Sequence, residues 1–308
     1  MKVTILGGTG RMGAWFARYF KEKGCRVVIW ARTVERLVKV AEDVGAEYKL
    51  EAEEAVNDAD MVMVSVPISV VPETVKKVSP YVKKGAILFD VASVKGVIPE
   101  VLRVEGDKNG YRTASVHPMF GPGARGIKGQ KIVVIPVRGH EDAAKWLADY
   151  FAEDGANVMF SDAETHDRMV ALTLALPHFV NIFFALLLSE SGEKPEFVRK
   201  FSGTTFSLQL TISESVLQES PDVYAEIQME NEKFKETLRR GEELFKRLSG
   251  AVLSGDKNEF VKQFLKAREW TLKDEESGRA YQKMYRMIEA LTGRKEAADE
   301  KEKPPAQS

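Results

Sequence analysis

Four histidines are the side chains of this 308-residue chain best suited to proton transfer near neutral pH, and His117 has the most distinctive surroundings. It lies in SVHPMFGPG (Ser115–Gly123), between the end of an expected strand and a proline turn. Ligands of open α/β sheets bind beyond the carboxyl ends of the strands, where a histidine can act as a general acid or base. A structural histidine bonded to loop carbonyls fits the same spacing equally well, so both interpretations stay open.

A second polar segment, DVASVKG (Asp90–Gly96), follows a neighbouring expected strand. The Ser93 hydroxyl and the Lys95 ammonium can reach the cleft that His117 faces, because carboxyl ends of parallel strands share one edge. The local alternative is that Ser93 caps a helix and Lys95 lies in solvent. Capping is the commoner use of such a serine and is favoured on the residues alone.

The other histidines do not form a metal-binding pattern. His166 and His178 are twelve residues apart, whereas two ligands on one helix face are typically four apart. His166 is expected near a helix start, and His140 is expected to begin a helix and lie in solvent. No cysteine or carboxylate cluster accompanies them, so we predict no metal.

A glycine-rich loop follows the first expected strand and opens a helix. Its residues fit G-x-G-x-x-G, and we predict that they bind a dinucleotide: Gly8, Thr9, Gly10, Arg11, Met12 and Gly13. The first glycine permits the turn, the second lets the backbone approach a pyrophosphate, and the third lets helix and strand pack closely. The alternative is a glycine-rich turn that binds nothing, which this strand–loop–helix context makes the weaker interpretation.

The end of the second strand indicates the flavour of the cofactor. NAD sites carry an acidic residue there, but Trp30 is followed by Ala-Arg-Thr and the next carboxylate is Glu35. Arg32, helped by Thr33 and Arg36, can pair with a 2′-phosphate. We therefore predict NADP rather than NAD. If Arg32 is only a solvated loop charge, cofactor specificity is loose.

Two regions of different pattern must position these residues. Short β-branched runs alternate with helical patterns over residues 1–160, which predicts a Rossmann-type α/β domain whose mostly parallel sheet is covered on both faces. The expected strands are 2–6, 26–30, 61–66, 86–91, 113–116, 131–135 and 157–161, and the expected helices are 11–23, 33–44 and 140–154. Ser161–Glu164 has the form of a capping box with the Ser161 hydroxyl as the cap. Residues 161–290 are expected to form an all-α domain, and 291–308 a disordered tail.

Composition excludes several classes of protein. The formal net charge is −1, which disfavours a protein that mainly grips nucleic acid or an anionic membrane. The single cysteine, Cys25, excludes a disulfide framework and a cysteine-rich zinc site. The sequence shows no signal-peptide pattern, so we expect a cytoplasmic protein.

One uncharged stretch, Met169–Ser189, is long enough to span a bilayer. However, Pro177, His178 and Asn181 lie at its middle, where hydrocarbon would penalise polar groups. No second span follows. We therefore expect a helix buried in a protein core or a subunit interface, and no membrane partner.

Together these motifs resemble the prephenate dehydrogenase family of tyrosine biosynthesis. The resemblance rests on GGTGRMG, DVASVKG and HPMFGPG in the first half, and on His166-Asp167, LPH (176–178) and VYAEIQMEN (223–231) in the second. It extends to about residue 290, and the opening looks like the archaeal branch. HPMFGP after a Rossmann core is specific, whereas many dehydrogenases share the glycine loop.

The resemblance implies a nucleotide-binding domain followed by a helical dimerisation domain, and oxidative decarboxylation of prephenate or arogenate with hydride transfer to NAD(P). It implies that His117 takes the proton of the substrate's ring hydroxyl and that Ser93 hydrogen-bonds His117 and the substrate. His178 would lie in the substrate pocket. We expect a homodimer formed through the apolar helix, with a small molecule as substrate.

The sequence departs from the family pattern at one cation. Related chains carry an arginine on the helix after the apolar one, but here Ser207 or Glu214 falls near that position. The candidates to replace it are Lys95, which we predict with His178 to bind substrate, and Arg125, Arg239 and Arg268. An acid there suits an amine-bearing substrate such as arogenate. The alternatives are another NADP-dependent reductase on this scaffold, for 3-hydroxyacids or imines, and a non-catalytic nucleotide-binding sensor.

Overall fold

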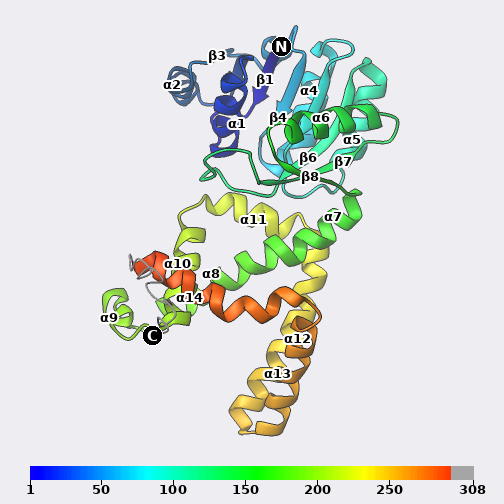
Figure 1. Cartoon of the computed structure of the whole chain (residues 1–308). Coiled ribbons are helices and arrows are strands. Elements are labelled where there is room, and N and C mark those ends of the chain that lie inside the picture. The colour runs from blue at the N-terminus through cyan, green and yellow to red at the C-terminus, as the bar shows by residue number, and fades with distance from the viewer. Residues whose placement is uncertain (293–308) are drawn as a thin grey trace, which may run out of the picture. The chain divides into compact units, whose positions relative to one another are not determined.

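A computed structural model describes residues 1–292, and the predicted tail at 291–308 falls almost wholly outside the described residues. The chain forms two compact units (Figure 1). The first comprises Met1–Leu176 and Pro221–Thr237, and the second comprises Pro177–Ser220 and, among the described residues, 238–292. The first unit thus adds two helical segments to the region 1–160 that the sequence pattern marks as one domain.

The first unit contains an eight-stranded sheet in the order β3-β2-β1-β4-β5-β6-β7-β8. All neighbours are parallel except β6 and β7, so the predicted mostly parallel sheet is confirmed. The order 3-2-1-4-5-6 is that of dinucleotide-binding folds. The strands are β1 (Lys2–Leu6), β2 (Arg26–Trp30), β3 (Glu47–Tyr48), β4 (Met61–Val64), β5 (Ile87–Asp90), β6 (Arg112–Pro118), β7 (Lys131–Pro136) and β8 (Asn157–Phe160).

Helices cover both faces of this sheet, each over its own apolar core. On one face pack α1 (Arg11–Glu22), α2 (Val34–Val44) and α6 (Glu141–Glu153). On the other pack α3 (Ala52–Val56), α4 (Val71–Val78) and α5 (Ile98–Asn109). The central strands read as continuous apolar runs because both of their faces are buried. Helices α3, α4 and α5 were not expected from the pattern.

The register of the sheet sets the position of the site. Leu6 of β1 lies beside Val64 of β4, Val64 beside Asp90 of β5, and Asp90 beside Ser115 of β6. The glycine loop after Leu6 and His117, two residues beyond Ser115, therefore stand at the same edge. The strand order reverses between β1 and β4, and such a switch point forms the ligand crevice of open sheets.

The first unit also holds α7 (Ala163–Val170), the π-helical turn η3 (Ala171–Ala175) and α11 (Pro221–Met229). Asp162, not Ser161, caps α7, because its carboxylate accepts from the Thr165 N–H at 2.8 Å. The predicted capping serine is therefore wrong by one residue. The Ser161 hydroxyl instead donates to the carbonyl of Asp162.

The second unit is helical, as the sequence predicts. Its elements are α8 (Leu176–Ser189), α9 (Pro195–Lys200), α10 (Thr204–Leu217), most of α12 (Glu232–Ser254), α13 (Lys257–Thr271), the 3₁₀ turn η4 (Glu275–Arg279) and α14 (Ala280–Thr292). Asn181 is the buried residue of α8, and its amide oxygen accepts from Gln209 at 2.7 Å and Ser213 at 2.9 Å. These bonds hold α10 against α8 at the buried amide of Asn181.

The segment Ala163–Ser189 is helical throughout, and by length and composition it could cross a membrane. Only 22% of its most apolar stretch is buried within this chain. A single helix of this kind is weak evidence for a membrane span, since core helices pass the same test. The sequence predicts that this helix is buried in a protein core or in a subunit interface. Burial in the core of its own chain is wrong for most of the helix, so the subunit interface is the setting that is left.

Candidate active site

The loop from Gly7 to Gly13 is shaped by close backbone approach. The motif predicts that Gly8 makes the tight turn. In the structure it is Gly7 that has a positive φ, +87°, so Gly7 makes the turn. A Cβ on Gly13 would lie 2.3 Å from the Gly7 carbonyl oxygen, which only a glycine avoids. Helix α1 has no side-chain hydrogen bond at its N-cap, Gly10. Its first N–H groups therefore suit an anion, and the loop fits a dinucleotide pyrophosphate.

The end of β2 carries positive charge and no carboxylate. Arg32, Thr33 and Arg36 are all exposed. Thr33 is the N-cap residue of α2, but its side chain makes no capping hydrogen bond. These groups are therefore available to a ligand that lies beside the ends of β1 and β2.

His117, near the end of β6, is 4% exposed and is the first member of a chain of three side chains. Its Nδ1 lies 2.9 Å from Nε2 of His166 on α7. Nδ1 of His166 lies 2.8 Å from the Asp167 carboxylate. That carboxylate also accepts from the backbone N–H groups of Lys95 and Gly96, both at 2.9 Å. The sequence motif contains His166 and Asp167, but their approach to His117 was not expected.

Burial sets the protonation states of this chain. It lowers the pKa of His117 well below its ordinary value, and the nearby His166 and Lys95 lower it further. Burial also lowers the pKa of His166, against the opposing effect of Asp167. Burial alone would raise the pKa of Asp167, but the hydrogen bonds from His166 and the two backbone N–H groups outweigh it and lower that pKa. At neutral pH both imidazoles are therefore neutral and the carboxylate is ionised.

Lys95 is buried next to the three side chains His117, His166 and Asp167. Its side chain and that of Asp90 are both 0% exposed, and Nζ lies 2.9 Å from Asp90 Oδ1 and 2.8 Å from the Val116 carbonyl oxygen. Ser115 donates to the other Asp90 oxygen. The structure thus differs from both expectations for Lys95: it is neither in solvent nor exposed for a substrate carboxylate. Asp90, which the sequence reasoning passed over, is what holds it inside.

Ser93 and His178 remain predictions. Ser93 is half-buried in the loop after β5, and within residues 1–292 its hydroxyl makes no hydrogen bond to His117. It also does not cap α5, whose N-cap is Val97. His178 is half-buried on α8 in the second unit, and burial lowers its pKa.

The helix that was expected to carry a family arginine is α10. Its Glu214 forms an ion pair with Arg199 of α9, with side chains 43% and 51% exposed. The Ser207 hydroxyl donates to the Gly203 carbonyl within α10. Arg199 is a cation that the sequence pattern did not single out, because nothing in a separation of 15 positions signals its contact with Glu214. The other candidates are exposed: Arg125, Arg239 and Arg268.

His140 corrects a further expectation. It is 7% exposed rather than in solvent, and its Nε2 lies 3.1 Å from Asp107 of α5. It precedes α6 at the N-cap position and makes no capping bond. His140 therefore links the residue before α6 to α5 and has no part in the site.

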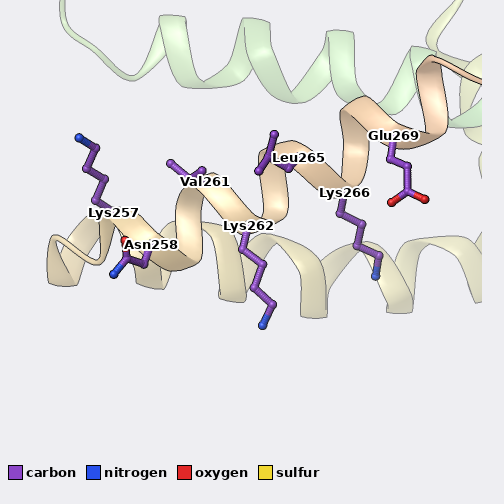
Figure 2. A pocket seen from close by; sticks show the side chains of 7 residues that line it. All are labelled: Lys257, Asn258, Val261, Lys262, Leu265, Lys266 and Glu269. Atoms are coloured by element: carbon purple, nitrogen blue, oxygen red, sulfur yellow. The ribbon is translucent and has the colours of Figure 1, made fainter.

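A hollow of about 730 Å³ lies along α13 of the second unit and is distinct from these residues. Figure 2 shows that a single helix lines it, with Lys262 and Lys266 directed away from Val261 and Leu265. It is an open helix surface without converging polar groups. Among residues 1–292, no group of three histidine, cysteine, aspartate or glutamate side chains could hold a metal ion.

Comparison with known families gives two matches that together span most of the chain. Residues 16–158 match the model of the prephenate dehydrogenase nucleotide-binding domain. Residues 162–266 match the model of the prephenate dehydrogenase dimerization domain. The first match begins just after the glycine loop and does not include it.

Curated relatives agree with these matches. A probable arogenate/prephenate dehydrogenase of Methanocaldococcus jannaschii is 32% identical over 265 residues, which are 85% of this chain and 59% of the relative. This chain thus spans little more than half of that protein's length. A 4-amino-4-deoxyprephenate dehydrogenase of Streptomyces pristinaespiralis is 28% identical and covers 87% of this chain and 90% of its own length.

A solved structure shares the fold. Prephenate dehydrogenase from Aquifex aeolicus, determined with hydroxyphenyl propionate and NAD+, superposes with a TM-score of 0.69. The match covers 89% of this chain and 98% of the other, at 23% sequence identity. It supports the pairing of a Rossmann-type unit with a helical unit in this chain.

Proposed function

Because the chain belongs to the prephenate dehydrogenase family, we propose that it oxidises and decarboxylates prephenate or arogenate as an NADP-dependent enzyme of tyrosine biosynthesis. The observation that carries this proposal is His117. It is a neutral, buried imidazole at the sheet edge that also bears the glycine loop. That edge is where a nicotinamide cofactor and its substrate meet in this fold class.

The reaction needs one proton acceptor. His117 takes the proton of the ring hydroxyl while the hydrogen on the same carbon leaves as hydride. When bound, the dinucleotide supplies the acceptor for that hydride. The resulting ring ketone loses carbon dioxide, and the electron pair of the broken carbon–carbon bond makes the ring aromatic. The phenolate so formed recovers the proton from His117, so the histidine ends each turnover unchanged.

The glycine loop and the end of β2 support a dinucleotide, and NADP in particular. Gly13 lets α1 approach the Gly7 carbonyl, and the first N–H groups of α1 can bind the pyrophosphate. Arg32, Thr33 and Arg36 would surround a ribose 2′-phosphate. A guanidinium favours phosphate there, and no carboxylate at this strand end stands ready for the NAD ribose.

We further propose a cytoplasmic homodimer. The match to a dimerization domain supports this, as do the apolar side chains that α8 leaves exposed. They are Phe179, Val180, Phe183, Leu186 and Leu187, between 36% and 55% exposed. A stripe of this kind on a helix that lacks charges is typical of a subunit interface.

Prephenate and arogenate differ in one group, a keto against an ammonium group. The Arg199–Glu214 pair on α9 and α10 offers both charges at the helix where the family cation is expected. Both substrates are therefore included in the test.

The test measures the formation of reduced nicotinamide by its absorbance. The substrates are prephenate, arogenate, a 3-hydroxyacid and a cyclic imine, each with NADP and with NAD. We expect turnover with prephenate or arogenate, and His117→Asn should lower kcat by at least about 100-fold. His140→Asn is the matched control, since the His140 ring bonds to Asp107 of α5 and takes no part in the site. NADPH binding without turnover of any substrate would contradict the proposal and favour a sensor, and turnover of only a 3-hydroxyacid or imine would replace it.

A further inference from the structure

We infer that Asp167 and His166 are positioning residues that hold His117 in its Nδ1–H tautomer and leave Nε2 as the proton acceptor. The role of that acceptor rests on the proposed function, but the tautomer itself is a property of the resting protein. The inference is carried by the three-member contact chain His117–His166–Asp167, in which both links are hydrogen bonds of 2.8–2.9 Å.

The direction of each hydrogen bond follows from the carboxylate end. Asp167 receives the N–H groups of Lys95 and Gly96, one on each oxygen, so the group is an acceptor on both sides. Nδ1 of His166 must therefore carry the hydrogen that faces Asp167. Since burial keeps His166 neutral, its Nε2 has a lone pair and can only accept.

It follows that Nδ1 of His117 donates the hydrogen of the 2.9 Å contact to His166. His117 is also neutral at neutral pH, so its Nε2 has no hydrogen and presents a lone pair. The opposite tautomer would place two lone pairs face to face at the first link. The burial of both rings leaves no water to relieve that repulsion.

The same chain stabilises the charge that forms during the reaction. When Nε2 of His117 takes the hydroxyl proton, the ring becomes an imidazolium 2.9 Å from His166. His166 is polarised by the Asp167 carboxylate, and that negative charge offsets the cost of a buried cation. The charged and titratable groups around His117 are His166 and Asp167 from α7, and Lys95 and Asp90 from β5 and its following loop. Lys95 disfavours the imidazolium although it is paired with Asp90, so Asp167 is the carboxylate that stabilises the imidazolium through His166.

Asn231, which is 64 positions from Asp167 in the sequence, holds the three hydrogen-bonded side chains in place. Asn231 is 0% exposed, and its amide donates to the Asp167 carbonyl oxygen at 3.0 Å. Its amide oxygen accepts from the Phe234 N–H at 3.1 Å. Asn231 belongs to the segment Pro221–Thr237, which is part of the first unit. A residue from the second half of the chain thereby holds the middle of α7, where His166 and Asp167 lie.

The first experiment reads the tautomer directly, in the full-length unmodified protein without substrate. Nitrogen NMR of ¹⁵N-histidine-labelled protein distinguishes a protonated ring nitrogen from an unprotonated one. The chain has four histidines, so His→Gln variants assign the signals. We expect His117 to show a protonated Nδ1 and an unprotonated Nε2. A protonated Nε2 in neutral His117 would overturn the inference, and this reading is made on the wild-type protein once the signals are assigned.

The second experiment uses Asp167→Asn. The amide carries no negative charge, and its NH2 group replaces one of the two oxygens that accept from His166, Lys95 and Gly96. The imidazolium of His117 therefore loses the charge that stabilises it through His166. By analogy with carboxylate-to-amide changes in serine-protease triads, kcat should fall by about 100-fold or more. The Michaelis constant for the cofactor should stay within about two-fold. Asp162→Asn is the matched control on the same helix, because asparagine caps helices as well as aspartate.

A structural defect and the loss of the Asp167 charge give different pH profiles of kcat. Removal of the Asp167 charge makes His117 harder to protonate, so the acid limb of kcat should move to lower pH in Asp167→Asn. A merely misfolded fraction would lower kcat at every pH and leave the limb in place, which would contradict the inference. Retention of wild-type kcat within about two-fold would also contradict it.

The outcomes separate the inference from the proposed function. If no prephenate or arogenate is turned over but NMR finds the Nδ1–H tautomer, the activity is wrong and the positioning role of Asp167 and His166 stands. If the substrates are turned over but Asp167→Asn behaves as Asp162→Asn does, the activity stands and the positioning role is wrong.

Discussion

The buried ion pair of Lys95 and Asp90 makes the strongest stability prediction. Lys95→Met keeps the length and most of the volume of the side chain but removes its charge. The Asp90 carboxylate is then left 0% exposed with two remaining donors, the Ala92 N–H and the Ser115 hydroxyl. An ionised group left without its counterion in a dry interior is strongly destabilising.

The magnitude follows from the geometry. At the 2.9 Å separation of Nζ and Oδ1, an effective dielectric constant of about 20 gives an attraction of about 6 kcal/mol. Desolvation of both groups offsets much of that value, as the lowered pKa of Lys95 reflects: burial lowers it and Asp90 raises it. When one partner is removed, the other stays buried without a counterion, and this lowers the free energy of unfolding by about 3–5 kcal/mol. With a urea m-value of ~2 kcal/mol/M, the midpoint should fall by roughly 2 M.

The assay is urea unfolding followed by tryptophan fluorescence. Trp15, Trp30 and Trp146 belong to the first unit, so the signal reports mainly on the part that contains the pair. Lys145→Met is the matched control, because Lys145 is 77% exposed and its pair with Asp149 contributes at most about 0.5 kcal/mol.

A double variant tests the reasoning behind the number. In Asp90→Leu with Lys95→Met neither charge is present, so at least half of the lost free energy of unfolding should return. A loss below about 1 kcal/mol in Lys95→Met alone would refute the argument, since it would mean that Asp90 is easily solvated or protonated. A double variant as unstable as the sum of two independent losses would refute it as well.

Three further predictions address the cofactor, acid stability and assembly. Arg32→Ala should weaken NADP binding by about 10–100-fold and NAD binding by less than about three-fold, measured by fluorescence titration with Arg18→Ala as control. Equal losses for both cofactors would remove the phosphate contact. The pKa of His117 is lower in the folded than in the unfolded chain, so the unfolded chain binds more protons below pH ~6.5. The free energy of unfolding should therefore fall as the pH drops below that value, and less so in His117→Gln; a pH-independent value would contradict this. Light scattering at micromolar concentration should show a dimer that Leu187→Lys weakens, and a wild-type monomer would exclude the proposed assembly.

The sequence was sufficient for elements whose evidence is local. β1, β2 and β7 are short β-branched runs, and the structure gives them the predicted starts and nearly the predicted ends. Helix α5 escaped prediction because its residues IPEVLRVEGDKN include polar groups, a glycine and only a weak apolar face. The two-residue β3 is too short to have a pattern.

The site was only partly predictable, because its decisive contacts are distant in sequence. His117 stood out by its setting, but its partner His166 lies 49 residues away. His140 was expected in solvent because it precedes a helix, whereas Asp107, 33 residues earlier, draws it inside. The five-residue spacing of Asp90 and Lys95 is visible in the chain. Only the fold shows that both side chains are buried and pair with each other.

The low pKa of His117 is compatible with its role as a base for a reason that lies in the reaction. Before hydride leaves, the ring hydroxyl is an ordinary alcohol and a weak base cannot deprotonate it. As hydride leaves, positive charge grows on the carbinol carbon and the hydroxyl becomes strongly acidic, so even a weak base accepts its proton. A stronger base would be protonated at rest and useless, whereas burial keeps Nε2 of His117 unprotonated. The Asp167 carboxylate, acting through His166, then stabilises the imidazolium for the short time it exists. The same weakness helps the final step, because an imidazolium of low pKa readily returns its proton to the phenolate.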